Sequence, residues 1–266
     1  DRLQLLADLN HAIERDEFEL YYQPKVEIAT GRVLAVEALL RWRHPHFGTV
    51  PPLEFITIAE DTGLIVAIDK WVIEHACAQN RAWQETGLPD LRMAVNISGA
   101  QFRQSELFET IRHALAASRL AAECLEIEVN ESVVMHNPAE AIVALEKLSQ
   151  IGVQVAIDDF GTSYSSLSYL KRLPIDKLKI DRSFIREVSS DLDDAAIVKA
   201  TIGLAHNLRL KVVAEGVETA EQLQILRSLG CDAYQGAFKS RPLTAKQFES
   251  SIRAEFRLPA EPAFAS

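Results

Sequence analysis

Two adjacent carboxylates, Asp158 and Asp159, stand at the end of a short apolar segment, residues 153–157, with Gly161 close behind. The segment is rich in β-branched residues, which predicts a buried strand. Successive side chains on a strand point to opposite faces, so we expect the second carboxylate to turn at the strand's end, where Gly161 frees the backbone. Neighbouring carboxylates repel unless a cation lies between them or one is protonated, and a divalent metal is the usual cation. An isolated pair is more often a helix cap, so the metal interpretation depends on the other strand ends.

Polar side chains stand near the ends of most other predicted strands as well. Residues an even number apart on a strand share a face, so Glu37 and Arg41 point the same way, as do Asn96 and Ser98. A single acid at a strand end is usually a cap or part of a surface ion pair. Acids, an amide and cations converging on one end of a sheet instead indicate an active site. The residues concerned are Glu37, Arg41, Asn96, Glu128, Asp158, Asp159, Lys179 and Glu215.

The candidate ligand atoms in this set are oxygens, which favours Mg²⁺ or Mn²⁺ over Zn²⁺. Five carboxylates and one amide exceed what a single magnesium ion needs, so two metals that share a bridging aspartate fit better. Two such metals activate a water and hold both sides of a phosphorus during an in-line displacement. The accompanying cations suit a phosphate-bearing substrate. Metal chemistry alone does not identify that substrate, and a barrel enzyme acting on any phosphodiester fits these residues.

The elements that position these residues alternate along the chain. The strands predicted at 18–23 and 33–42 are joined by a turn at 29–32, which makes them antiparallel, and Pro24 marks the end of the first. Helices alternate with the later strands, which predicts parallel βα units. These strands are 91–97, 125–129, 153–157, 177–180, 211–214 and 232–235, and the helices are 2–15, 52–85, 105–118, 138–150, 165–173, 193–207, 220–229 and one from 244. Eight strands predict an α/β fold closed into a modified TIM (β/α)8 barrel with its first strand antiparallel.

Composition limits the class of protein. The 266 residues are 48% hydrophobic and 25% charged, as in soluble globular domains, and the formal charge of −10 argues against binding polymeric nucleic acid. No apolar stretch reaches the ~20 residues that a membrane helix needs. The chain does not begin with Met, so we expect a fragment of a longer protein or a processed chain. We expect one barrel domain over 1–258 and a disordered tail over 259–266. Three cysteines without a CxxC pair favour a reducing compartment, and we expect a cytoplasmic location.

Several of these segments, taken in order, resemble the motifs of the EAL domain family. The resemblance begins with Tyr21-Tyr22-Gln23-Pro24 and extends from about residue 9 to about residue 252. The other segments that carry it are Glu37-Ala38-Leu39 with Arg41, Asn96-Ile97-Ser98, Glu128 with Glu131, Asp158-Asp159-Phe160-Gly161, Lys179-Ile180-Asp181, Glu215-Gly216-Val217-Glu218 and Gln235-Gly236. Each motif is short, but the ordered set is highly specific.

The resemblance implies a bacterial phosphodiesterase that opens cyclic di-GMP to linear pGpG. It implies the modified barrel, with its first strand antiparallel, and two divalent metals, Mg²⁺ or Mn²⁺, with Ca²⁺ inhibitory. It further implies a homodimer and an upstream regulatory domain outside this chain, in a parent protein that is in some cases membrane-anchored.

The resemblance also assigns roles to individual residues. One metal is bound by Glu37, Asn96, Glu128 and Asp158. Asp158 bridges to the second metal, which Asp159 also binds, and Glu215 is a further acid at the metal site. Lys179 orients the attacking water. The metal-site carboxylates Glu37 and Glu215 are catalytic residues together with it. The dinucleotide is contacted by Gln23, Arg41 and Gln235. The loop that couples dimerisation to metal binding includes Glu131, Phe160, Gly161 and Ser163.

The chain departs from the family pattern at three places. Ser163 stands where the family usually has Gly, Asn130 where it has Thr, and residues 237–239 are less apolar than usual. None of these changes removes a metal ligand, and we expect the first two to affect rate and dimer coupling more than chemistry. The main alternative is a catalytically weak or silent cyclic di-GMP receptor that signals through its dimer loop, but the complete set of ligand acids favours the enzyme.

Overall fold

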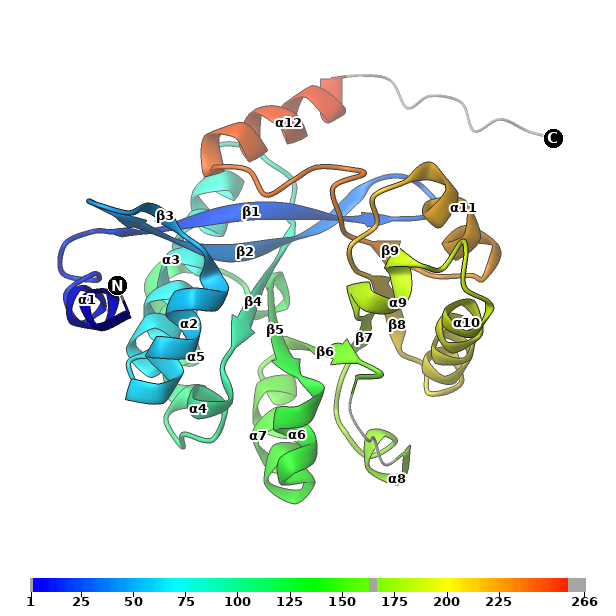
Figure 1. The fold of residues 1–266 in the computed structure, drawn as a ribbon, viewed down its shortest axis with the longest axis horizontal. Coiled ribbons are helices and arrows are strands. Elements are labelled where there is room, and N and C mark those ends of the chain that lie inside the picture. The colour runs from blue at the N-terminus through cyan, green and yellow to red at the C-terminus, as the bar shows by residue number, and fades with distance from the viewer. Residues whose placement is uncertain (1, 163–166, 258–266) are drawn as a thin grey trace.

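The computed structural model describes residues 2–162 and 167–257, so Ser163 and the predicted tail at 259–266 lie outside the described residues. Nine strands form one sheet, and eight of them close into a barrel surrounded by helices (Figure 1). The strands are β1 (Phe18–Glu27), β2 (Val33–His44), β3 (Gly48–Val50), β4 (Arg92–Ile97), β5 (Leu125–Asn130), β6 (Gln154–Phe160), β7 (Lys177–Ile180), β8 (Lys211–Ala214) and β9 (Ala233–Tyr234).

Strand β1 is the one barrel strand that runs against its neighbours. It is antiparallel to both β2 and β9, whereas the pairs from β2 through β4 to β9 are parallel. The closed mixed barrel with an antiparallel first strand confirms the predicted fold class. The short β3 pairs with β2 outside the barrel, and the sequence analysis did not predict it.

Pro24 does not end the first strand, contrary to the prediction. β1 continues to Glu27, and Pro24 lies opposite Val36 in the register with β2. The backbone N–H of Tyr22 faces away from β2 and donates to the carbonyl of Leu243. Because alternate residues of a strand face the same edge, the nitrogen of Pro24 also faces away from β2, so no bond of that ladder is lost.

The helices cover the outside of the barrel (Figure 1). They are α1 (Arg2–Leu9), α2 (Pro52–Thr62), α3 (Ile65–Glu85), α4 (Gly99–Phe102), α5 (Leu107–Ser118), α6 (Glu131–His136), α7 (Pro138–Gln150), α8 (Leu167–Leu170), α9 (Arg182–Arg186), α10 (Leu192–Asn207), α11 (Ala220–Ser228) and α12 (Ala245–Arg257), with a 3₁₀ turn at Ala122–Cys124. The first helix ends at Leu9, earlier than predicted, and α4, α6 and α9 were not predicted. Among the described residues, no helix has the length and apolarity to span a lipid bilayer.

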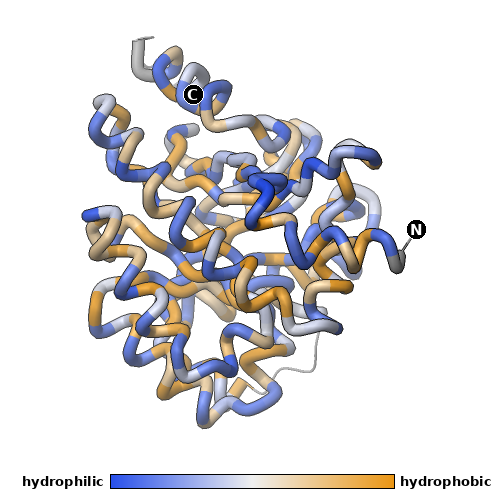
Figure 2. Tube along the Cα trace, turned by 90° about the vertical axis from the view of Figure 1, so that its left-hand side faces the viewer, coloured by the Kyte–Doolittle hydropathy of each residue, from blue (hydrophilic) through white to orange (hydrophobic). Residues whose placement is uncertain are grey.

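The apolar core lies between the strands and the outer helices. In β5, Leu125, Ile127 and Val129 are fully buried on one face. On the other face, Glu126 and Glu128 are as deeply buried, but they reach lysines of β1 and β7 across the barrel. Hydrophobic and hydrophilic residues are interspersed along the whole trace (Figure 2). The side chains of β5 that point into the barrel are therefore charged, and those that face the outer helices are apolar.

Candidate active site

Lys179 lies at the centre of an acidic cluster at the carboxyl end of the barrel. Its ammonium nitrogen is 2.5 Å from a carboxylate oxygen of Glu128, 2.6 Å from Glu215, 3.2 Å from Asp158 and 3.8 Å from Glu37. Burial by itself lowers the pKa of a lysine, but the surrounding carboxylates outweigh burial and raise the pKa of Lys179 well above its usual value. Lys179 is therefore charged and holds side chains from four strand ends together.

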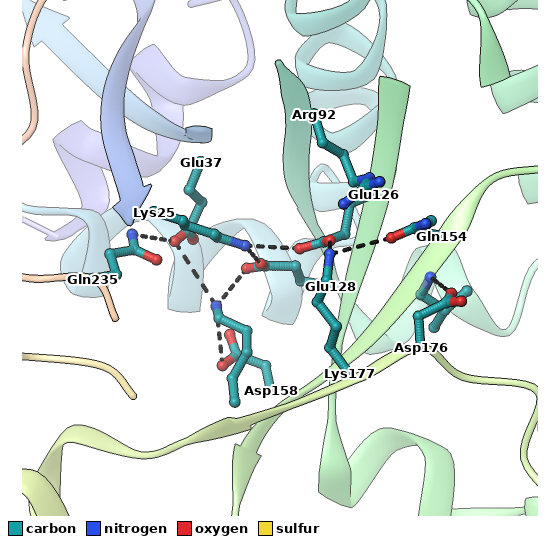
Figure 3. A network of polar contacts seen from close by, with 12 residues as sticks. Lys25, Glu37, Arg92, Glu126, Glu128, Gln154, Asp158, Asp176, Lys177 and Gln235 are labelled. Atoms are coloured by element: carbon teal, nitrogen blue, oxygen red, sulfur yellow. Dashed lines mark hydrogen bonds and ion pairs between the residues drawn. The ribbon is translucent and has the colours of Figure 1, made fainter. Parts of the chain in front are cut away.

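Glu37 joins this cluster to two amide side chains. Asn96 Nδ2 donates to one carboxylate oxygen of Glu37 at 2.5 Å, and Gln235 Nε2 donates to the other at 2.6 Å. Gln235 Nε2 also lies 2.9 Å from the side-chain oxygen of Gln23 (Figure 3 shows Glu37 and Gln235). The structure thus brings four sequence-predicted site residues, from β1, β2, β4 and the end of β9, into one contiguous network.

The two adjacent aspartates belong to strand β6, which ends at Phe160 and not at residue 157 as predicted. The β6–β7 register shifts between Ile157 and Phe160, and Asp159 itself adopts a left-handed backbone conformation with φ of 53°. A bulge of this kind re-aims a side chain that would otherwise point to the opposite face. It brings ligand oxygens of Asp158, Asp159 and Glu215 within 4.8 Å of one another.

This trio of carboxylates fits a divalent cation. Burial, followed by the charge of Asp158, raises the pKa of Asp159 to about 6. Burial likewise raises the pKa of Glu215 to about 8, although the charge of Lys179 opposes this. Carboxylates whose ionisation is disfavoured in this way are the groups that a hard oxygen-seeking cation stabilises. The donor set is all oxygen, as Mg²⁺ and Mn²⁺ prefer.

A second set of charges lies beneath the cluster, inside the barrel. Lys25 of β1 bonds Glu126 at 2.8 Å and also pairs with Glu128, while Lys177 of β7 pairs with Glu126 (Figure 3). The order Lys177–Glu126–Lys25–Glu128–Lys179 alternates in sign, and we call these residues the charge ladder. Sequence reasoning did not include Lys25 in the site. The sequence does contain an indication of its position, because Lys25 lies two residues after Gln23 and so shares its face of the strand.

Gly236 explains how Gln235 reaches Glu37. A Cβ atom on Gly236 would lie 2.1 Å from the carbonyl oxygen of Val217, so no other residue fits without moving the backbone. The same approach allows the Val217 N–H to donate to the carbonyl of Gln235 at 3.1 Å. The dipeptide therefore anchors the end of β9 against the segment after β8.

Arg41 lies apart from the acidic cluster. Its guanidinium donates to the carbonyl of Leu40 at 2.8 Å and lies 5.4 Å from the ring centre of Tyr21. Within the residues that the structure describes, Arg41 forms no ion pair. It remains half-buried on the strand that carries Glu37, with its charge available to an incoming anion.

Two residues at the start of α6 hold the segment that follows Asp158. Asn130 Nδ2 donates to Asp159 at 2.6 Å, while its side-chain oxygen caps α6 by accepting from the N–H of Ser132. Glu131 accepts from the N–H of Gly161 at 3.1 Å. Phe160, which precedes Gly161 in the chain, is buried. Asn130, which the sequence marked only as a departure from the family, is thus a direct partner of an active-site carboxylate.

A closed mixed barrel with a lysine-centred carboxylate cluster at the carboxyl ends of its parallel strands defines an α/β-barrel protein with a site compatible with divalent metals. Comparison with known proteins narrows this class. The chain belongs to the EAL domain family, which it matches over residues 6–242.

Two relatives with similar sequences come from Pseudomonas aeruginosa. The bifunctional diguanylate cyclase/cyclic di-GMP phosphodiesterase MucR is 49% identical over 252 residues, covering 95% of this chain and 37% of MucR. The cyclic di-GMP phosphodiesterase NbdA is 45% identical over 260 residues, covering 98% of this chain and 33% of NbdA. This chain therefore spans about a third of the length of these curated relatives.

A solved structure shares both the fold and half of the sequence. The PaMucR phosphodiesterase in complex with c-di-GMP superimposes with a TM-score of 0.90 at 50% identity, covering 92% of this chain and 99% of that one. The family and the fold that the sequence motifs predicted are confirmed.

Proposed function

We propose that this domain hydrolyses cyclic di-GMP to linear pGpG in a metal-dependent reaction. The observation that carries the proposal is a complete set of acids around Lys179 in a chain 50% identical to a phosphodiesterase solved with c-di-GMP. Relatives with 38–49% identity over most of the chain are also named cyclic di-GMP phosphodiesterases.

The metal site of this proposal uses the carboxylates at the barrel mouth. Glu37, Asn96, Glu128 and Asp158 would hold one ion, and Asp158, Asp159 and Glu215 the other. A shared role for Asp158 is supported by its contacts: its carboxylate lies 3.2 Å from the Lys179 ammonium, and its ligand oxygen lies within 4.8 Å of those of Asp159 and Glu215. Bound Mg²⁺ or Mn²⁺ would supply an activated water and charge stabilisation at the phosphorus.

The residues of the chain orient the reactants. Lys179, charged and buried, would donate a hydrogen bond to the attacking water and hold Glu128 and Glu215 in place. Arg41, which has no carboxylate partner among the described residues, would bind a phosphate oxygen. Gln23 and Gln235 would contact the dinucleotide beside Glu37, where the buried side-chain oxygen of Gln235 has no partner in the described part of the chain.

Regulation of the domain forms the second part of the proposal. Glu131, Phe160 and Gly161, with Ser163 of the adjoining segment, would couple a homodimer contact to the second metal site. The bond from Gly161 to Glu131 supports this coupling, because it ties α6 to the strand that carries Asp159. An upstream regulatory domain remains a prediction, and the three free cysteines support a cytoplasmic location.

The test is hydrolysis of cyclic di-GMP by the purified chain with Mg²⁺, with Mn²⁺, with Ca²⁺ and with EDTA, following pGpG by chromatography. We expect product with Mg²⁺ or Mn²⁺, none with EDTA and little with Ca²⁺, whose larger and looser coordination suits in-line geometry poorly. Saturable binding of the dinucleotide without product would make the domain a receptor. If the chain neither bound the dinucleotide nor formed product, the proposal would be overturned.

A further inference from the structure

A groove on the outside of the barrel is spatially separate from the site described above. It lies between α4 and α5 on one side and α6 and α7 on the other, and its volume is about 650 Å³. This volume falls in the range of small-molecule sites, ~300–1,000 Å³. Its apolar lining includes Phe102, Leu107, Phe108, Val133, Ala144 and Leu148.

Cations surround this apolar groove. Arg103 and Lys147 line it beside the imidazole of His136, and within the described residues neither of these two cations forms an ion pair. Glu140, on the same helix as Lys147, is the acid of the lining. The chain has a formal charge of −10, so a local excess of positive charge distinguishes this groove from the acidic average of the chain. An apolar floor beside unpaired cations is complementary to an organic anion with an apolar body.

The helix that forms one wall of the groove is connected to the active site. α6 has six residues, with Val133 and His136 on the groove and Glu131 at its first position. Asn130, which caps α6, donates to Asp159 at 2.6 Å, and Glu131 accepts from Gly161 at 3.1 Å. Both contacts are made by residues at the start of this six-residue helix, so the groove and the carboxylates share one structural element.

We propose that this groove is an effector site for a small organic carboxylate with an acyl or aromatic body, and that its occupation changes metal binding through α6 and Asn130. The anion pairs with Lys147 and Arg103, and its apolar body packs on the phenylalanines. Because coupling between two binding sites is reciprocal, metal binding changes the affinity of the groove by the same factor.

The first experiment measures binding of decanoate to the whole chain by isothermal titration calorimetry, with decanol as the uncharged comparison. We expect saturable decanoate binding and much weaker decanol binding. Lys147→Gln should weaken decanoate by roughly tenfold, about 1.4 kcal/mol. The matched control is Lys199→Gln, an exposed lysine of α10 away from the groove, which should leave the affinity unchanged. Ala144→Phe, which fills the groove, should abolish binding.

The second experiment titrates Mn²⁺ with and without saturating decanoate. We expect a change in Mn²⁺ affinity of about fivefold or more, which Asn130→Ala should remove. Absence of saturable decanoate binding, or binding that ignores both Lys147→Gln and Ala144→Phe, would overturn the site. Binding that leaves Mn²⁺ affinity unchanged would overturn the effector role. Neither readout needs turnover, so failure here is distinguishable from failure of the proposed hydrolysis.

Discussion

Each oxygen of the Glu37 carboxylate accepts a hydrogen bond from a different amide group. Asn96 donates to one and Gln235 to the other, and the Lys179 ammonium lies 3.8 Å away. A carboxylate is the one side chain of this shape that accepts at both ends. Its role therefore depends on the absence of any donor of its own, and replacing one oxygen by NH₂ places two donors face to face.

Glu37→Gln is expected to lower pGpG formation by at least about a hundredfold, because it removes a charge from the proposed metal site and disrupts two hydrogen bonds. The measurement is steady-state turnover in Mg²⁺ together with Mn²⁺ affinity by calorimetry, and both should fall. Glu19→Gln is the matched control, because Glu19 lies on the neighbouring strand and pairs with the exposed Arg43. Unchanged turnover in Glu37→Gln would remove this residue from the site.

Asp69 illustrates the cost of a buried acid outside the site. Its side chain, 6% exposed on α3, accepts the N–H of Ser98 at 2.9 Å. Burial, opposed by the Ser98 bonds and aided by the charge of Glu60, raises the pKa of Asp69 to about 6. The folded state therefore holds a proton that the unfolded state releases near pH 3.8, and this acid lowers stability as pH rises from about 4 to 6.

Asp69→Asn should remove this pH-dependent cost, since its amide oxygen still accepts from Ser98. The free energy of unfolding of the variant, relative to the natural chain, should rise between pH 4 and 7 by about 3 kcal/mol, from the cost of 1.36 kcal/mol per pKa unit. Urea denaturation of the metal-free protein at several pH values measures this difference. A difference that stays constant across that range contradicts the assignment.

At the scale of elements, regular hydrophobic spacing predicted the strands and long helices well. β7 and β8, α7 and α10 begin and end within one residue of the predicted ranges. Periodicity did not predict α4, α6 and β3, because elements of three to six residues are too short to show a period. It also ended the strand at residue 157, whereas β6 extends to Phe160, because a bulge depends on the register with the next strand and not on local sequence.

The site shows the same division between local and tertiary information. The acids of the cluster were predicted, since each follows the inward face of its own strand. The pairing of Asn130 with Asp159 was not predicted, because the two residues meet only after β5 and β6 pair, with Asn130 opposite Asp158. The role of a side chain at such a junction is set by tertiary contact.

Two substitutions of Asn130 separate its two roles. Asn130→Ala loses the cap of α6 and the bond to Asp159, so it should cost about 1 kcal/mol of stability and weaken metal binding. Asn130→Thr, the residue usual in the family, retains a capping oxygen, but its hydroxyl is shorter than the amide and has one donor in place of two. It should restore most of the stability without restoring metal affinity. Thermal melts and Mn²⁺ calorimetry give the two readouts, and recovery of both in the Thr variant would rule out a positioning role.

At the scale of the whole molecule, the charge ladder connects parts of the barrel that are distant in sequence. Lys25 and Glu126 are 101 residues apart in the chain, yet both are buried and bonded at 2.8 Å. β1 joins the two ends of the run of parallel strands, because it pairs with both β2 and β9. Lys25 thus satisfies two interior carboxylates only when the barrel is closed, which ties the electrostatics of the interior to closure.

Lys25→Met should therefore destabilise the fold by about 3–5 kcal/mol, because removing one partner leaves Glu126 and Glu128 short of a buried cation. Urea denaturation of the metal-free chain measures the loss. Lys211→Met is the matched control, since its pair with Asp232 is solvent-exposed and should be worth less than about 1 kcal/mol. Lys25→Arg, which keeps the charge, should lose less than Lys25→Met and keeps the comparison measurable if the latter fails to fold. Equal losses in Lys25→Met and Lys211→Met would show that the ladder is no stronger than a surface pair, and barrel closure would then depend on the apolar contacts alone.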